Sequence, residues 1–119
     1  MPSPPPEGLS EAAARLWPGL AADVRAVTGG AEVDMLLLAD VLRAMDRLAG
    51  CREVLDREGL TTEGSTGQTR PHPLLVAESV LRREIAAGFE RLHLTPGVAR
   101  HNSHGVRNGR ITPAGGRLR

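Results

Sequence analysis

The chain has 119 residues, 40% of them hydrophobic and 2% aromatic, which is enough for one domain with a core of leucine, valine and alanine. All fifteen basic residues are arginine, against fourteen acids, and the lack of lysine excludes a P-loop nucleotide site and Schiff-base chemistry. The single cysteine, Cys51, excludes an intrachain disulfide framework and a zinc site built from cysteines.

The N-terminal segment, MPSPPPEG, has neither the basic nor the apolar part of a secretory signal. No apolar stretch of the chain approaches the roughly 18 residues that a membrane-spanning helix needs. We therefore expect a soluble, intracellular protein without a membrane partner. Residues 1–9 are proline-rich and are expected to form a flexible, extended arm.

Two short helices are expected after this arm. Ser10 is a good N-cap for a first helix over residues 11–17. Pro18 is expected to interrupt it, because a proline inside a helix removes a hydrogen-bond donor. A second short helix then covers residues 20–27 and ends at the glycine pair 29–30.

The clearest pattern in the sequence predicts one long helix over residues 31–58. Apolar residues recur there at intervals of four and three, which places them on one helical face. A second apolar stripe lies beside the first, so the helix is expected to contact two or more neighbours. The first stripe contains Leu37, Val41, Ala44, Leu48, Cys51 and Leu55, and the second contains Met35, Leu38, Leu42, Met45 and Ala49.

Gly59 is expected to end the long helix, and residues 60–72 are glycine-rich, which predicts a loop or a small β-hairpin. Pro73 then opens a second long helix that closes near residue 93. A short helix is expected from Thr95 to about residue 100, and residues 101–119 are expected to be a disordered basic tail. The predicted fold class is all-α, with a helical domain over residues 10–100 that contains a long antiparallel hairpin. The buried face of the second long helix is expected to contain Leu74, Ala77, Leu81, Ile85, Gly88 and Leu92.

No arrangement of residues in the sequence favours catalysis or a metal site. Asp40 and Asp46 each have an arginine nearby, which is typical of a solvated helix face. His101 and His104 lack a third ligand, and Cys51 occupies a core position of the helix. We therefore predict a protein that is not an enzyme and needs neither metal nor cofactor.

Charge is distributed unevenly along the chain. Residues 1–90 contain nine arginines and fourteen acids, while residues 91–119 contain six arginines and no acid. Such a basic segment is typical of a tail that binds a polyanion, although a solvated tail that binds nothing specific explains the same charges. Helices within residues 10–30 are a second-ranked nucleic-acid surface. The predicted DNA-binding residues are Arg70, Arg100, Arg107, Arg110, Arg117 and Arg119.

The order of these features resembles the small subunit of phage terminases over about residues 9–100. The resemblance rests on LWPGL in the first helix, AEVDMLLLADVL at the start of the long helix, the loop EGLTTEGSTGQTRPHP, and above all the closing FERLHLTPGVAR. Members of the branch it resembles typically end in an LGLTP motif followed by arginine. This chain has His93 where that motif has glycine, and His72 where an asparagine often precedes the proline.

The resemblance implies a protein of the host cytoplasm that binds double-stranded phage DNA at the packaging-initiation site as a ring of many subunits. It also implies recruitment and regulation of the large terminase subunit, which owns the ATPase and nuclease activities. In that picture the second stripe, Met35, Leu38, Leu42, Met45 and Ala49, packs against neighbouring subunits. The alternatives are a helical adaptor protein without enzymatic activity and a small DNA-binding regulator.

Overall fold

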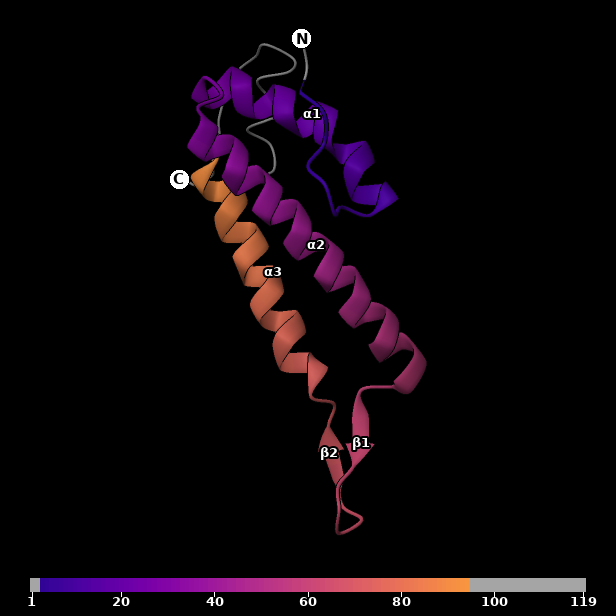
Figure 1. Ribbon diagram of the computed structural model, residues 1–119. Helices are drawn as coiled ribbons and strands as arrows, with labels where there is room; N and C mark the ends of the chain where they lie inside the picture. Colours follow the sequence, from indigo (N-terminus) through magenta and orange to yellow (C-terminus); the bar gives the residue numbers. More distant parts are fainter. Residues whose placement is uncertain (1–2, 95–119) are drawn as a thin grey trace, which may run out of the picture.

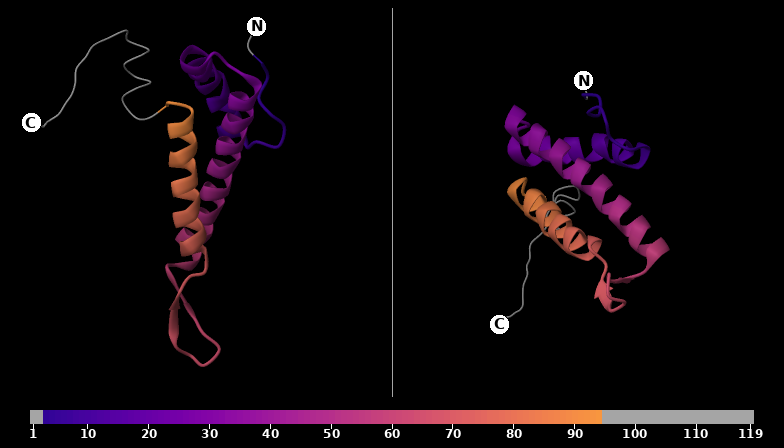
Figure 2. Two further views of the ribbon diagram at one scale, coloured as in Figure 1. Left: turned by 90° about the vertical axis from the view of Figure 1, so that its left-hand side faces the viewer. Right: turned by 60° about the horizontal axis from the view of Figure 1, so that its bottom comes forward.

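The structure, a computed structural model, describes residues 3–94, which form three helices and a small β-hairpin (Figure 1). The elements in chain order are α1 (Glu11–Thr28), α2 (Glu32–Glu58), β1 (Thr61–Glu63), β2 (Thr69–Pro71) and α3 (Leu74–Arg91). Helices α2 and α3 lie side by side in opposite directions, and α1 crosses the N-terminal half of α2 (Figure 2). The predicted helical class is therefore confirmed, with a two-stranded antiparallel sheet between α2 and α3.

Helix α1 begins as predicted, because the Ser10 hydroxyl accepts a hydrogen bond from the backbone N–H of Ala13 at 3.0 Å. The predicted break at Pro18 is wrong, since α1 continues to Thr28. Pro18 is exposed, so the hydrogen bond that it removes lies on the solvent side of the helix. Packing of the opposite side holds the two halves in one helix, through the buried residues Ala13, Trp17, Ala21 and Val24.

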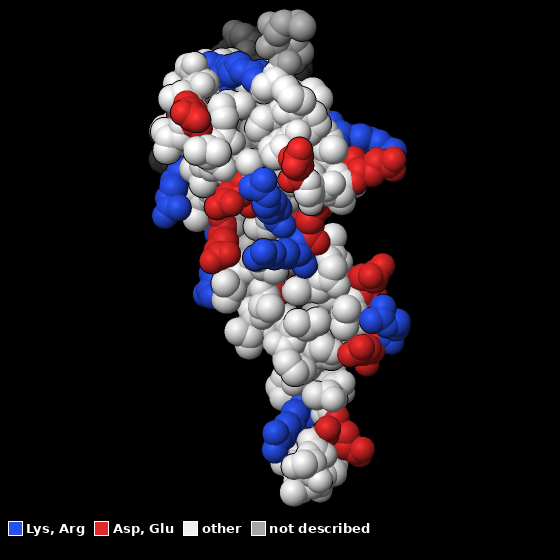
Figure 3. Space-filling view, viewed as in Figure 1, with Lys and Arg blue, Asp and Glu red and all other residues white. Residues whose placement is uncertain are grey.

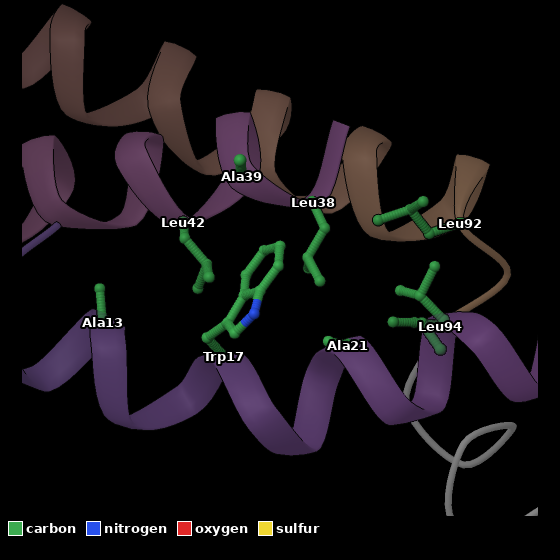
Figure 4. Packing of buried hydrophobic residues seen from close by; sticks show 9 residues of the cluster. Ala13, Trp17, Ala21, Leu38, Ala39, Leu42, Leu92 and Leu94 are labelled. Carbon is green, nitrogen blue, oxygen red and sulfur yellow. The ribbon is translucent and has the colours of Figure 1, made fainter. Parts of the chain in front are cut away.

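The core lies where α1 crosses α2 and where the chain leaves α3 (Figure 4). The indole of Trp17 points from α1 toward Leu38 and Leu42 of α2, and both leucines are 0% exposed. Leu92 and Leu94, at the end of α3, complete the same cluster. Full burial of a large apolar side chain contributes about 1.5–3 kcal/mol, so this crossing is the best stabilised region of residues 3–94.

Residues 3–9, predicted to form a flexible arm, lie against α1 in the structure. Trp17 Nε1 donates a hydrogen bond to the backbone carbonyl of Ser3 at 3.1 Å, and the Arg25 guanidinium donates to the Ser3 hydroxyl at 2.7 Å. Leu9 packs against the core from the other end of the arm. A buried indole N–H needs an acceptor, and the arm supplies it.

The hairpin between α2 and α3 follows from its glycines. The N–H of Gly64 donates to the carbonyl of Gln68 at 2.6 Å, and the N–H of Gly67 donates to the carbonyl of Gly64 at 2.9 Å. Gly67 has a φ of 87°, which a residue with a side chain adopts only at a steric cost. Residues 60–72 were predicted to form a loop or a small β-hairpin. The structure has the hairpin, and its strands β1 and β2 are exposed.

His72 joins the hairpin to both long helices and is only 7% exposed. Its Nδ1 accepts a hydrogen bond from the backbone N–H of Leu74 at 3.0 Å, in the first turn of α3. Its Nε2 lies 2.8 Å from Oε1 of Glu58, in the last turn of α2. Because Nδ1 acts as the acceptor, the ring proton lies on Nε2 and is donated to the Glu58 carboxylate.

Candidate assembly and nucleic-acid surfaces

Helix α3 is apolar over much of its surface but buries little of it. Of the predicted buried face, Gly88 and Leu92, which follows directly after the helix, are buried, whereas the other four residues are half-buried: Leu74, Ala77, Leu81 and Ile85. Val76 is 71% exposed. A helix with apolar residues on most sides is typical of one that is covered all round, whereas within residues 3–94 α3 has one neighbour, α2, along most of its length. The half-buried or exposed apolar residues of α3 are Leu74, Leu75, Val76, Ala77, Val80, Leu81, Ile85, Ala86, Ala87 and Phe89.

Gly88 sets how closely α2 and α3 approach. A Cβ added at Gly88 would overlap the Cγ2 atom of Val41. The two helices can thus approach closely because Gly88 has only a hydrogen atom where any other residue has a Cβ atom. The sequence placed Gly88 on the buried face of its helix, but its role in close packing is visible only once Val41 is known to lie opposite.

The two predicted stripes of α2 face two different helices of the same chain. The first stripe faces α3, as the contact between Val41 and Gly88 shows. In the second stripe, Leu38 and Leu42 pack against α1 and have no exposed surface left for a neighbouring subunit. Their assignment to an oligomer interface therefore needs correction, because the partner of these leucines is Trp17.

The rest of the second stripe lies at the surface. Met35 and Met45 are half-buried beside the core, and Ala49 is exposed. Met45 and Ala49 line a groove between α2 and α3 whose floor contains Leu48 and Ile85. The groove continues along α3, where it is bordered by Phe89, Arg82 and Arg83. These three remaining stripe residues keep their predicted role as interface candidates.

The predicted DNA-binding residues are separated by the fold. Arg70 is exposed on β2, with its side chain lying across Gly64 in the turn. Arg91, the first arginine of the acid-free segment, is exposed at the end of α3 remote from the hairpin, and the 18 residues of that helix span roughly 27 Å. The hairpin end therefore lies far from the point where the chain enters the basic segment (Figure 1). The other predicted residues lie outside the described residues: Arg100, Arg107, Arg110, Arg117 and Arg119.

Acidic and basic side chains are interspersed on the face seen in Figure 3, and no large area of one sign stands out there. Several arginines of residues 3–94 form exposed ion pairs, such as Arg52 with Glu78 at 3.2 Å, which links α2 to α3. Exposed pairs of this kind contribute at most about 1 kcal/mol. On this face the described part of the chain thus has no broad basic surface. Arg70 by itself provides only a small basic site.

The two acidic candidates for catalysis, Asp40 and Asp46, each contact another residue of the chain. Asp40 lies 3.9 Å from Arg43 on the exposed side of α2. Asp46 accepts hydrogen bonds from the backbone N–H of Ser10 at 2.8 Å and from its hydroxyl at 2.5 Å, and so ties the start of α1 to α2. This link, between residues 36 positions apart, has no signal in the sequence. Cys51 is half-buried and free, rather than fully buried as its core position predicted.

No group of three potential metal ligands occurs within residues 3–94, and His101 and His104 lie outside that range. Among the helices described, none is long and apolar enough to cross a membrane. Comparison of the chain with protein-family models, with curated proteins and with solved structures yields no match.

Proposed function

We propose that this protein is a small terminase subunit. It binds double-stranded phage DNA at the packaging-initiation site as a ring-shaped oligomer in the host cytoplasm. It recruits the large terminase subunit and regulates its ATPase and nuclease activities. In this proposal the chain itself is not an enzyme and uses no cofactor, because the chemistry of cleavage and translocation belongs to the large subunit.

The observation that carries the proposal is the turn at the end of α3, within the motif that resembles the terminase family. His93 has a φ of 61°, the left-handed conformation that glycine adopts most easily. Its N–H donates to the carbonyl of Glu90 at 3.0 Å, and the N–H of Leu94 donates to the carbonyl of Phe89 at 2.8 Å. These two bonds form a Schellman motif, in which glycine is the usual residue at the position of His93. The motif that the chain resembles has glycine at this position, so the local geometry supports the resemblance.

The open faces of α3 support assembly into an oligomer. Within residues 3–94, α3 packs along most of its length against α2 alone, so its exposed apolar residues leave surface that a further subunit can cover. Met45 and Ala49 lie beside this surface, and with Met35, which lies beside the core, they remain candidates for an interface. A ring needs two different contact surfaces on each subunit, and the two sides of the α2–α3 pair can supply them.

The distribution of arginine supports DNA binding through the C-terminal segment. Six arginines and no acid occur in residues 91–119, whereas residues 1–90 carry an excess of acids. Phosphate contacts by arginine supply most of the affinity of nonspecific DNA binding. Because Arg70 lies at the far end of α3, it makes at most a separate contact.

The salt dependence of DNA binding tests the proposal. Binding of the full chain to a mixed-sequence DNA duplex is measured by fluorescence anisotropy over a range of salt concentrations. A variant with glutamine at four tail arginines is then compared with the wild type. Each phosphate contact contributes a slope of about −0.9 to the plot of log K against log salt, so the variant should lose a slope of about 3 to 4. The four positions are Arg107, Arg110, Arg117 and Arg119.

A matched control carries glutamine at four arginines of the helical domain and should keep nearly the full slope. Equal loss in both variants would remove the tail as the main DNA-binding segment. No DNA binding by the wild-type chain would favour the helical adaptor protein instead. The four control positions are Arg15, Arg43, Arg47 and Arg57, all of them exposed.

A further inference from the structure

Two exposed rows of residues, one on α2 and one on α3, have complementary chemistry. Glu32, Leu36 and Asp40 are spaced four residues apart on α2, and all three are exposed. The i, i+4 spacing places them in one row along the helix. Leu36 is 63% exposed, and the neighbouring Val33 is 70% exposed. The row therefore presents an apolar knob with one carboxylate on each side of it.

The row on α3 has the opposite pattern. Arg83, Ala87 and Arg91 follow the same spacing, so a small residue lies between two arginines. Both arginines are exposed, and within residues 3–94 neither of them takes part in an ion pair, whereas Arg52 does. Ala87 is half-buried and leaves a shallow site between the two long side chains. It lines a depression between α2 and α3 together with Arg91 and Asp40.

The two rows have the same length, because the first and last residues of each are eight positions apart, or about 12 Å along the helix. Each row also has the same order of charged and apolar residues from either end, so the two helices can pair in a parallel or an antiparallel orientation. A leucine opposite an alanine allows the helices to approach closely, since rows of the i, i+4 type pack into one another's grooves. When Leu36 lies over Ala87 of another copy, the two carboxylates of its row meet the two arginines of the other row.

Within one chain the rows cannot meet in this way. Val41 and Gly88 occupy the contact between α2 and α3 of the same chain, which fixes that packing. Leu36 and Glu32 lie outside that contact and remain exposed, whereas the exposed Asp40 borders the depression that Ala87 and Arg91 line. Within residues 3–94, Leu36 and Glu32 thus have no partner on α3, while a second copy presents an α3 row that matches the α2 row in length and charge.

We infer that α2 of one subunit packs through Glu32, Leu36 and Asp40 against Arg83, Ala87 and Arg91 on α3 of a second copy. This inference rests on the assembly part of the proposed function and names the surfaces that produce it. The contact joins two different rows, so it can repeat from subunit to subunit around a closed ring. Complementary charges fix the register of the two helices, and Leu36 supplies the apolar anchor.

Charge reversal of each row tests the inference on the full chain. The first variant combines Arg83→Glu with Arg91→Glu, and the second combines Glu32→Arg with Asp40→Arg. Each variant places like charges opposite one another, so self-association should weaken by about tenfold or more. Native mass spectrometry without DNA gives the subunit number, and circular dichroism checks that the helical content is retained.

Mixing the two reversed variants provides the decisive result. The acidic α3 row of the first variant matches the basic α2 row of the second, and the two unchanged rows match each other as well. The equimolar mixture should therefore form assemblies that contain both chains, in equal numbers where the ring has an even number of subunits. A control variant, Arg15→Glu with Arg57→Glu, changes the net charge as much as the first variant does but outside the rows, and it should assemble like the wild type.

Substitution of the apolar knob gives a second readout that does not depend on charge. Leu36→Ala should weaken self-association, whereas Leu16→Ala, at an exposed leucine of α1, should not. A wild-type oligomer that is unaffected by either charge reversal would overturn the inference and leave the proposed function standing. A wild-type chain that is monomeric at micromolar concentration would overturn both.

Discussion

Gly88→Ala is the substitution that tests the packing of α2 against α3 most directly. The new methyl group would overlap Cγ2 of Val41, and a valine in a helix has essentially one χ1 rotamer, so it cannot turn away. Overpacking of a close helix contact costs about 1–3 kcal/mol of unfolding free energy. The higher helix propensity of alanine offsets about 1 kcal/mol of this cost.

Gly50→Ala is the matched control, because Gly50 lies in α2 with no atom near the position of an added Cβ. This variant should gain about 1 kcal/mol from helix propensity alone. The two glycine variants should therefore differ by about 1–3 kcal/mol, and that difference is the steric cost at Gly88. Combining Gly88→Ala with Val41→Ala should remove the overlap, so the double variant should lose less stability than the two single effects predict together.

Urea unfolding followed by circular dichroism measures these differences. The protomer concentration must be the same in every sample, because self-association raises the apparent stability. Equal stabilisation by the two alanine variants would refute the close approach at Gly88 and with it the arrangement of α2 and α3. An additive double variant would show that Val41 is not the residue in contact.

Four further substitutions test other parts of the fold by the same unfolding measurement. Ser10→Ala should cost about 1 kcal/mol or more, because it removes the N-cap of α1 and a hydroxyl bond to α2, and an unchanged midpoint would contradict that role. His72→Ala should cost about 1–3 kcal/mol, since it removes a buried ring and the two hydrogen bonds that join the hairpin to α2 and α3, and a cost below about 0.5 kcal/mol would contradict the link that it forms. Leu42→Ala should cost about 2–5 kcal/mol by leaving a cavity beside the tryptophan, and a small effect would mean that the leucine faces a neighbouring subunit after all. His93→Gly should stabilise by about 0.5–1 kcal/mol, because it relieves a left-handed conformation, and destabilisation would contradict the turn at the end of α3.

Local chemistry allowed several parts of the fold to be predicted from the sequence. Ser10 marks the start of α1 and Gly59 the end of α2, because capping depends on residues within one turn of the helix end. The glycines of residues 60–72 likewise predicted a turn, and in the structure this turn joins the two strands of the small sheet. The periodic pattern of residues 31–58 predicted the long helix with its correct end.

The parts that sequence could not predict depend on contacts between distant residues. Pro18 was expected to end a helix, but burial of Trp17 and its neighbours on the opposite side outweighs the one lost hydrogen bond. The stripe containing Leu42 showed that a second partner was needed, and no property of the stripe distinguishes α1 of the same chain from another subunit. Asp46 lies near arginines in sequence, yet it bonds to Ser10 across 36 positions.

The same distinction applies to the candidate surfaces. The arginine content of residues 91–119 is a property of sequence alone and predicted a polyanion-binding segment directly. The row of Glu32, Leu36 and Asp40 cannot be recognised as an interface from the sequence, because an exposed leucine between acids is common on helix surfaces. Its meaning depends on the position of α3, which leaves this side of α2 open.

The solution mass of the full chain, with and without double-stranded DNA, tests the proposed function most directly. Native mass spectrometry or light scattering on a sizing column at moderate salt gives this mass. The proposal predicts one discrete species of many subunits without DNA, and a complex of that species with DNA when the duplex is added. A monomer or dimer that keeps its mass in the presence of DNA would contradict it.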